Sequence, residues 1–202
     1  MSKLKRIEIC GGIASGKSTL AKLIASKLTN GTVVLENFEA NPFLRLFYTD
    51  PPKYSFETEI SFLLQHLNAI KALSPTSNWL VCDFSFLLDK AFADVTLDAK
   101  TRKTFLAVHS RIMSVLGPPD LVIHLQCRPT HLLNRIKQRG REVEKGIESG
   151  YLLALDKSIR CNFKELKNSV KALRIDSTKY NFAKNIPAKQ QVFNIVLKSL
   201  GS

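Results

Sequence analysis

Near its N-terminus the chain reads Gly11-Gly12-Ile13-Ala14-Ser15-Gly16-Lys17-Ser18-Thr19, a full match to the pattern G-x-x-x-x-G-K-[ST]. An apolar run at residues 6–10 leads into it, and an amphipathic pattern at residues 17–28 follows it. In such a loop, backbone N–H groups and the N-terminus of the next helix point at phosphate oxygens, which glycine allows to approach closely. Lys17 can reach the β and γ phosphates, and the Ser18 hydroxyl suits Mg²⁺. The nine residues therefore predict a nucleoside triphosphate site between a strand and a helix.

The rest of the chain alternates short apolar runs with stretches of helical periodicity, an order typical of a parallel sheet with crossover helices. We expect strands at residues 6–10, 32–35, 79–83, 121–125 and 173–175. The expected helices cover residues 17–28, 56–73, 99–116, 129–139 and 186–200. Because no internal repeat or low-complexity linker interrupts this order, we expect a single α/β domain over residues 1–202.

The composition is that of a folded chain with a surplus of positive charge. With 45% hydrophobic and 23% charged residues, it excludes a mostly disordered or fibrous protein. Thirty Lys and Arg against seventeen Asp and Glu give a formal net charge of +13. Most of this charge lies in residues 128–202, where sixteen basic residues face six acidic ones. The surplus favours a polyanionic partner, such as nucleotide phosphates, nucleic acid or an acidic membrane surface.

The apolar runs and the cysteines indicate the cellular setting. No run approaches the roughly 18 residues of a membrane span, and Gly11 and Gly12 interrupt the run after Lys5, unlike a signal peptide. We therefore expect an unexported cytoplasmic protein with no membrane partner. Without a C-x-x-C pair, neither a zinc site nor a redox dithiol is indicated. Buried free thiols are expected at Cys10, Cys82, Cys127 and Cys161.

Two carboxylates stand at the ends of predicted strands, Glu36 after the second and Asp83 at the end of the third. In a parallel sheet both emerge at the carboxyl edge, beside the loop at residues 11–19. One can serve as a base for a hydroxyl group. We expect Asp83 and Ser18 to bind Mg²⁺, and we expect Asp83 to contact the substrate as well. A carboxylate in this position is often only a helix cap, but two of them beside a phosphate-binding loop favour catalysis.

Three further blocks resemble the deoxynucleoside kinase family, which includes bacterial deoxyadenosine and deoxyguanosine kinases. Residues 36–59 are similar to the family segment that begins with the catalytic Glu and ends on a helix facing the base. Residues 83–93 resemble the acid-Arg-Ser region and the helix after it, and residues 135–147 resemble the Arg-rich lid. The resemblance implies a P-loop kinase fold, in which helices flank a five-stranded parallel sheet and a lid spans about residues 137–149.

The resemblance also implies catalytic roles. Glu36 would be the general base that takes the proton from a nucleoside 5′-hydroxyl. Arg135 and Arg139, four residues apart on one helical face, would clamp phosphates together with Lys17, and Arg141 would lie near the reacting oxygens. Such residues suit phosphoryl transfer, which depends on an oriented acceptor and on dense positive charge.

For the substrate, the resemblance implies a deoxynucleoside held by several blocks. Tyr48 and Glu144 would bind the sugar 3′-hydroxyl, and the base would stack on Phe92. The hydrogen-bonding edge of the base would meet Glu59, His66 and Asp89.

Four positions depart from the usual family pattern. Glu59 stands where many members have Gln, His66 where many have Arg, Phe84 where Arg often follows the acid, and Asn37 where Pro is usual. An ionised Glu only accepts hydrogen bonds, which suits the N1–H and 2-amino donors of guanine, whereas adenine requires a proton on Glu59. We expect a purine, with guanine preferred.

The missing arginine at Phe84 bears on how the 5′-hydroxyl is held. Arg141 or Lys90 is expected to supply the cation in its place. The expected reaction is ATP- and Mg²⁺-dependent phosphorylation of a deoxynucleoside at its 5′-hydroxyl in nucleotide salvage, by a homodimer packed through helices.

Two alternatives stay open. A nucleoside monophosphate kinase resembling thymidylate kinase would share the fold, but it needs a cation for the acceptor phosphate where Phe84 stands. A P-loop protein that binds nucleic acid through the basic half of the chain would explain the charge, but it gives no role to Glu36 or Glu144.

Overall fold

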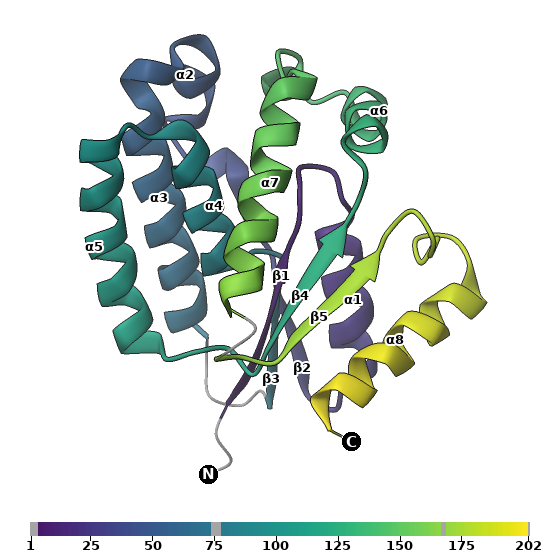
Figure 1. Cartoon of the computed structure of the whole chain (residues 1–202). Helices are drawn as coiled ribbons and strands as arrows, with labels where there is room; N and C mark the ends of the chain where they lie inside the picture. The colour runs from purple at the N-terminus through teal and green to yellow at the C-terminus, as the bar shows by residue number, and fades with distance from the viewer. Residues whose placement is uncertain (1–3, 74–77, 167–168, 202) are drawn as a thin grey trace.

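A five-stranded, all-parallel sheet forms the centre of the structure, a computed structural model that describes residues 4–73, 78–166 and 169–201 (Figure 1). The strands, in chain order, are β1 (Lys5–Cys10), β2 (Gly31–Val34), β3 (Trp79–Cys82), β4 (Leu121–Gln126) and β5 (Ala172–Asp176). Their spatial order is β2-β3-β1-β4-β5, and Ile7 of β1 pairs with Val81 of β3 and Leu121 of β4. The loop after β1 therefore emerges at the middle of the carboxyl edge, where ligands bind in such sheets.

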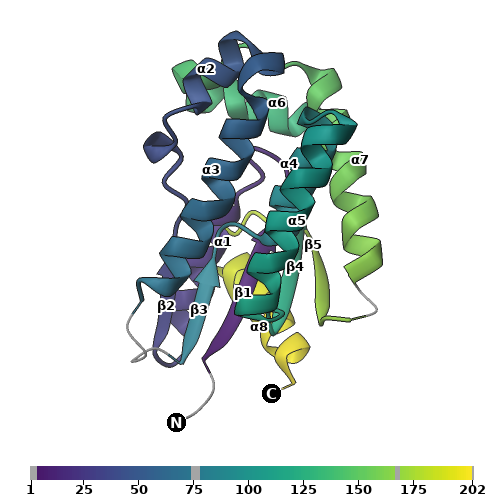
Figure 2. The ribbon, with the colours of Figure 1, turned by 90° about the vertical axis from the view of Figure 1, so that its left-hand side faces the viewer.

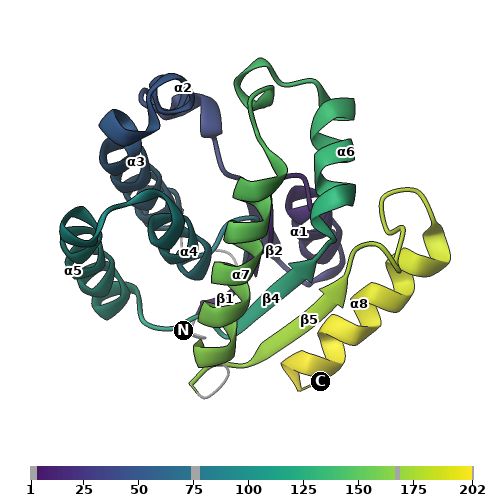
Figure 3. The ribbon, with the colours of Figure 1, turned by 45° about the horizontal axis from the view of Figure 1, so that its top comes forward.

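Helices cover both faces of the sheet. In chain order they are α1 (Lys17–Lys27), α2 (Leu44–Thr49), α3 (Pro51–Lys71), α4 (Phe86–Thr96), α5 (Ala99–Leu116), α6 (Pro129–Arg139), α7 (Ser149–Leu166) and α8 (Ile186–Leu200), with the 3₁₀ turns η1 (Phe38–Ala40) and η2 (Glu142–Glu144). Helices α1 and α8 lie on one face, and α3, α4, α5 and α7 lie on the other (Figures 1 and 2). The short helix α2 and the turn η2 lie beyond the carboxyl edge (Figure 3).

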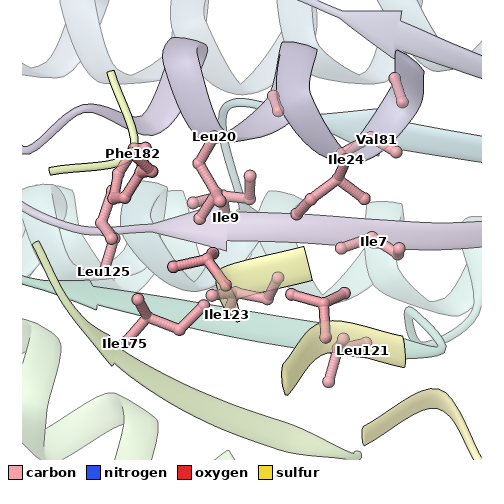
Figure 4. Packing of buried hydrophobic residues seen from close by; sticks show 14 residues of the cluster. Ile7, Ile9, Leu20, Ile24, Val81, Leu121, Ile123, Leu125, Ile175 and Phe182 are labelled. Carbon is pink, nitrogen blue, oxygen red and sulfur yellow. The ribbon is translucent and has the colours of Figure 1, made fainter. Parts of the chain in front are cut away.

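Branched aliphatic side chains fill the layer between the sheet and the helices α1 and α8 (Figure 4). Ile7 and Ile9 of β1 alternate along the strand with residues of the opposite face, and they pack against Leu20 and Ile24 of α1. All four are fully buried. Strand β3 is apolar on both faces, as is usual for parallel strands between two helical layers, whereas the opposite face of β1 carries the buried ion pair of Arg6 and Glu8.

Capping residues in the sequence account for several helix ends. The Asp98 side chain accepts hydrogen bonds from two backbone N–H groups at the start of α5, and Gly117, with a φ of 69°, ends the helix. Pro129 opens α6, and Gly140, with a φ of 65°, closes it. The helices predicted at residues 99–116 and 129–139 are confirmed for this reason.

The five predicted strands are confirmed within one residue at each end. The helix predicted at residues 56–73 is wrong at its start, because α3 begins at Pro51. Proline has no N–H to lose in the first turn of a helix, so Pro51 and Pro52 do not interrupt it. Helices α2, α4 and α7 are additional to those predicted from periodicity.

The cysteines are free, and Cys10, Cys82 and Cys127 are buried as predicted. The prediction is wrong for Cys161, which is exposed on α7 because Ile159 and Phe163 take the buried side of that helix. Within the described residues, no helix is both long and apolar enough to cross a bilayer.

Candidate active site

A cavity of about 330 Å³ opens at the carboxyl edge of the sheet, bounded by the loop after β1, by α2, α3 and α4, and by η2. The predicted site residues that line it are Ile13, Ala14, Ser15, Gly16, Lys17, Ser18, Thr19, Glu36, Tyr48, Glu59, Asp83, Asp89, Phe92, Arg135, Arg139, Arg141 and Glu144. Gly11, Gly12 and His66 lie behind this lining, and His66 is only 3% exposed. Residues far apart in the sequence thus share one cavity.

The loop after β1 requires glycine where it turns. Gly11 has a φ of 155°, and a Cβ there would lie 2.6 Å from the carbonyl oxygen of Leu125 in β4. Gly16, with a φ of 103°, sits at the N-cap of α1. Both positions have a positive φ that other residues rarely adopt, and Gly11 is closely packed as well, so the loop follows from its glycines.

Lys17 lies along this loop at the first turn of α1. Its Nζ donates to the carbonyl oxygens of Gly11, at 3.0 Å, and Gly12, at 3.3 Å. Burial lowers the pKa of the ammonium group, while Glu36 and Asp83 act to raise it. The cation is therefore held over the backbone that would cradle phosphate.

Arg135 of α6 is fixed against the same loop. Its guanidinium donates to the Ser15 carbonyl oxygen at 3.1 Å, and to both the carbonyl oxygen and the hydroxyl of Ser177, at 3.1 and 3.2 Å. Arg135 therefore ties the loop to the segment after β5 while it lines the cavity.

Glu36 and Asp83 meet at the carboxyl edge, as their strand positions predict. The backbone N–H of Glu36 donates to Asp83 Oδ1 at 2.7 Å, and the Ser18 side chain also hydrogen-bonds to Asp83. Burial raises the pKa of Asp83, whereas these hydrogen bonds and Lys17 act to lower it.

His66 joins two carboxylates at the floor of the cavity. Its Nε2 lies 3.2 Å from Glu36 Oε2, and its Nδ1 lies 3.0 Å from Asp89 Oδ2. Burial alone would lower the pKa of His66, but Asp89 and Glu36 raise it to about 10. The ring is therefore an imidazolium at neutral pH, and each N–H donates to one carboxylate.

Phe84 supports that imidazolium. The two rings stack at 4.0 Å between centroids with 4° between their planes, and Phe84 is fully buried. This imidazolium also affects Glu36. Burial acts to raise the pKa of Glu36, but the hydrogen bond and charge of His66, together with Lys17 and Arg141, lower it.

The prediction that Lys90 could replace the missing arginine is wrong. Its Nζ lies 3.3 Å from Glu165 Oε2, and the residue does not line the cavity. Lys90 projects towards α7. The cations that act on Glu36 are His66, Lys17 and Arg141.

Arg139 and Arg141 converge on Glu144 above the cavity. Arg139 donates to Glu144 Oε2 from Nη2 at 2.6 Å and from Nε at 3.1 Å, and Arg141 Nη1 donates to Glu144 Oε1 at 3.3 Å. The Arg141 guanidinium also lies 3.9 Å from the ring centroid of Phe38. Both arginines are thus oriented by protein contacts.

Glu59 of α3 also lines the cavity. It is 5% exposed, and its Oε1 accepts a hydrogen bond from the Thr96 hydroxyl at 3.0 Å. Burial raises the pKa of Glu59 to about 8, with Asp89 and Glu36 adding to the shift and Thr96 opposing it. Burial also raises the pKa of Tyr48, so its phenol keeps its proton.

Several lining residues were not among the predicted site residues. Phe38, Phe62 and Tyr151 contribute aromatic surface from η1, α3 and α7. Phe38 and Phe62 lie within or near a block that resembles the family, so their aromatic character was a usable signal. Tyr151 had none, because α7 itself was not expected.

A parallel sheet that carries a phosphate-binding loop on its central strand, with arginines above it, defines a P-loop nucleotide-binding enzyme of the α/β class. The family model described as deoxynucleoside kinase matches residues 7–200. The chain belongs to the deoxynucleoside kinase family and is a phosphotransferase, for which the family implies the use of ATP.

Known relatives are named as kinases of different deoxynucleosides. Deoxyguanosine kinase of Bacillus subtilis is 29% identical over 89% of this chain and 89% of its own length. Deoxyadenosine/deoxycytidine kinase of the same organism is 34% identical over 72% of this chain and 70% of its own length. The solved structure of deoxyadenosine kinase from M. mycoides with bound dCTP has a TM-score of 0.80 at 24% identity, over 96% of this chain and 99% of that one, and it confirms the fold.

Proposed function

We propose that the protein transfers the γ-phosphate of ATP to the 5′-hydroxyl of a purine deoxynucleoside, giving the 5′-monophosphate in nucleotide salvage. One observation carries this proposal: a single cavity is lined by the Glu36 carboxylate and Lys17 and also by the buried Glu59 and Asp89. A phosphate donor on the loop and a base at the far wall would place a 5′-hydroxyl next to Glu36.

The charges around Glu36 suit phosphoryl transfer. A pKa below its ordinary value keeps Glu36 ionised at neutral pH, so it can accept a proton from the hydroxyl. Lys17, Arg139 and Arg141 line the same cavity and would stabilise the charge that spreads over the transferring group.

The donor set at Ser18 and Asp83 fits Mg²⁺. Both side chains offer oxygen, the ligand atom this ion takes, and they lie within hydrogen-bonding distance of each other. We propose that Ser18 holds the ion directly and Asp83 holds it through water. Bound there, Mg²⁺ would neutralise charge on the β and γ phosphates.

The sugar would lie between the Tyr48 phenol and Glu144, which both line the cavity. Residues 137–149 would form the lid, since they include η2 and the arginines that Glu144 orients. Against a monophosphate kinase stands Phe84, which is buried and apolar where a cation for the acceptor phosphate is needed.

Incubation with ATP, Mg²⁺ and each deoxynucleoside or deoxynucleoside monophosphate, with ADP measured, tests the proposal. A purine deoxynucleoside should turn over. Turnover of a monophosphate alone would refute the proposal and favour the alternative kinase.

Glu36→Gln tests the role of the base. It should lower kcat by at least ~10² without changing the affinity for ATP. Glu39→Gln is the matched control, since Glu39 is exposed three residues away. Near-normal turnover of Glu36→Gln would remove Glu36 from the mechanism.

We also propose a cytoplasmic homodimer packed through helices. Leu64 of α3 is 47% exposed and Val115 of α5 is 50% exposed, on two helices that lie next to each other (Figure 2). Sedimentation analysis should give twice the monomer mass, and a concentration-independent monomer would contradict the dimer.

A further inference from the structure

Arg141 acts on Glu36 from the chain segment that follows α6. Both residues line the same cavity. Burial acts to raise the pKa of Glu36, and Arg141 is among the cations that lower it. The backbone of Arg141 belongs to no strand or long helix, because Gly140 closes α6 and η2 begins only at Glu142. The position of the guanidinium therefore depends on the contacts of its own side chain.

Glu144 and Phe38 contact this guanidinium from two different segments of the chain. Glu144 accepts a hydrogen bond from Arg141 Nη1 at 3.3 Å, whereas Arg139 donates to the same carboxylate at 2.6 Å. The guanidinium carbon of Arg141 lies over the ring of Phe38, 3.9 Å from its centroid. Phe38 begins η1, two residues after Glu36. The ring of Phe38 therefore joins Arg141 to the segment that carries Glu36.

A contact of this kind suits a guanidinium that must also bind oxygen atoms. A cation within about 6 Å of a ring centroid is attracted by the negative face of the ring, and a planar guanidinium stacks well on such a face. The contact uses none of the N–H groups, which stay available to acceptors. Phe38 can therefore hold Arg141 in place while the donors of Arg141 face the oxygens of the transferring phosphoryl group.

We infer, building on the proposed function, that Phe38 is a positioning residue whose ring docks Arg141 beside Glu36 when the proposed lid closes. This chain has Phe84 where an arginine often follows the strand-end acid. Since Lys90 pairs with α7 instead, Arg141 is the expected substitute that remains. Because Arg141 belongs to the proposed lid, its charge reaches Glu36 only in the closed state, which the contact with Phe38 stabilises. Activation of the acceptor hydroxyl is thereby coupled to closure of the lid.

Turnover of Phe38→Leu and Phe38→Tyr, with ATP, Mg²⁺ and a purine deoxynucleoside, tests the inference. Leucine keeps an apolar side chain but has no aromatic face, so kcat should fall about 10-fold while KM for the nucleoside stays within about twofold of the wild type. Tyrosine keeps the aromatic face and should retain the wild-type kcat. Phe43→Leu is the matched control, because Phe43 is a half-buried aromatic residue of the same segment that is not among the described residues lining the cavity. A wild-type kcat in Phe38→Leu, or an equal loss in Phe38→Tyr, would overturn the inference.

Arg141→Met shows whether Phe38 acts through Arg141. This variant should lower kcat on the order of 10²-fold, because it removes the charge itself. Adding Phe38→Leu to Arg141→Met should lower kcat no further, since the contact between the two side chains is already lost. If the two losses multiply instead, Phe38 does not act through Arg141 and the inference is wrong.

Limited digestion with trypsin measures the same contact without any turnover. Trypsin cleaves after arginine where the backbone opens, and the bond between Arg141 and Glu142 lies in the proposed lid. Cleavage there should be about 10-fold faster in Phe38→Leu than in the wild type or in Phe38→Tyr, because the open state is more populated. Equal rates of cleavage would contradict the docking role of Phe38. If the wild type phosphorylates no nucleoside but cleavage responds as expected, the kinase proposal fails and the docking of Arg141 by Phe38 stands.

Discussion

Replacement of His66 by Gln is expected to lower the free energy of unfolding by about 4 kcal/mol at pH 7. The pKa of His66 is about 10 in the folded protein, against an ordinary 6.5. At pH 7 its protonation therefore stabilises the folded state by about 1.4 kcal/mol for each pH unit between 7 and 10. The value agrees with the roughly 3–5 kcal/mol lost when one partner of a buried ion pair is removed. Glutamine can still hydrogen-bond, but it removes the cation that His66 shares between Glu36 and Asp89.

The dependence on pH has a defined sign. Because the folded pKa of His66 lies above the unfolded one, its stabilisation is complete below pH 6.5 and is lost as the pH rises towards 10. Urea unfolding of wild type and variant from pH 6 to pH 10 measures this, and the difference between them should shrink steadily over that range.

His124→Gln is the matched control. His124 is also a buried histidine, but burial and nearby arginines lower its pKa to about 4, so it is neutral throughout this range. Its replacement should shift stability by an amount that is constant from about pH 8 to pH 10, where the imidazole is neutral in the folded and the unfolded chain alike. A His66 difference below about 1 kcal/mol, or one that is constant with pH, would refute the ion-pair reasoning.

Three further substitutions and modifications probe the structure. Phe84→Ala should lower the free energy of unfolding by about 3–5 kcal/mol, because it empties a fully buried aromatic site, and thermal unfolding measures the loss. An unchanged melting temperature would show that Phe84 does not pack as described. Gly11→Ala should weaken ATP binding at least ~10-fold in calorimetry, since the new Cβ would lie 2.6 Å from the Leu125 carbonyl oxygen. An affinity for ATP equal to that of the wild type would mean that the loop adjusts without cost. A thiol reagent should label Cys161 rapidly in the native protein and the other three cysteines only after denaturation, as their burial requires, and rapid labelling of all four would contradict that burial.

The sheet and the phosphate-binding loop were predictable because their signals are local. Gly11 and Gly16 set the loop whatever lies around it, and Asp98 and Gly117 mark the ends of α5. The strand-end positions of Glu36 and Asp83 were equally informative, since parallel strands bring their carboxyl ends to one edge.

The wall that faces the base was not predictable in the same way. His66 and Phe84 depart from the family pattern at positions eighteen residues apart, and only the fold shows that their rings stack. The raised pKa of Glu59 comes first from burial and then from Asp89 and Glu36 nearby, and these are properties of three-dimensional packing. For these residues, the sequence shows that they depart from the family pattern. It does not show which neighbouring side chains compensate for the departure.

Helix α3 carries both Glu59 and His66, seven residues apart on one side of a continuous helix. Two helical turns correspond to about 10 Å of rise, and a helix of this kind does not stretch. In the proposed complex, α3 therefore sets a fixed distance between two contacts. Glu59 binds the base of the nucleoside, and His66 holds the Glu36 carboxylate beside its 5′-hydroxyl. A nucleoside that already carries a 5′-phosphate would be too long for this distance, because its phosphate would meet Glu36 where the hydroxyl belongs. The same rigid spacing that recognises the base would thus end the reaction after a single phosphate.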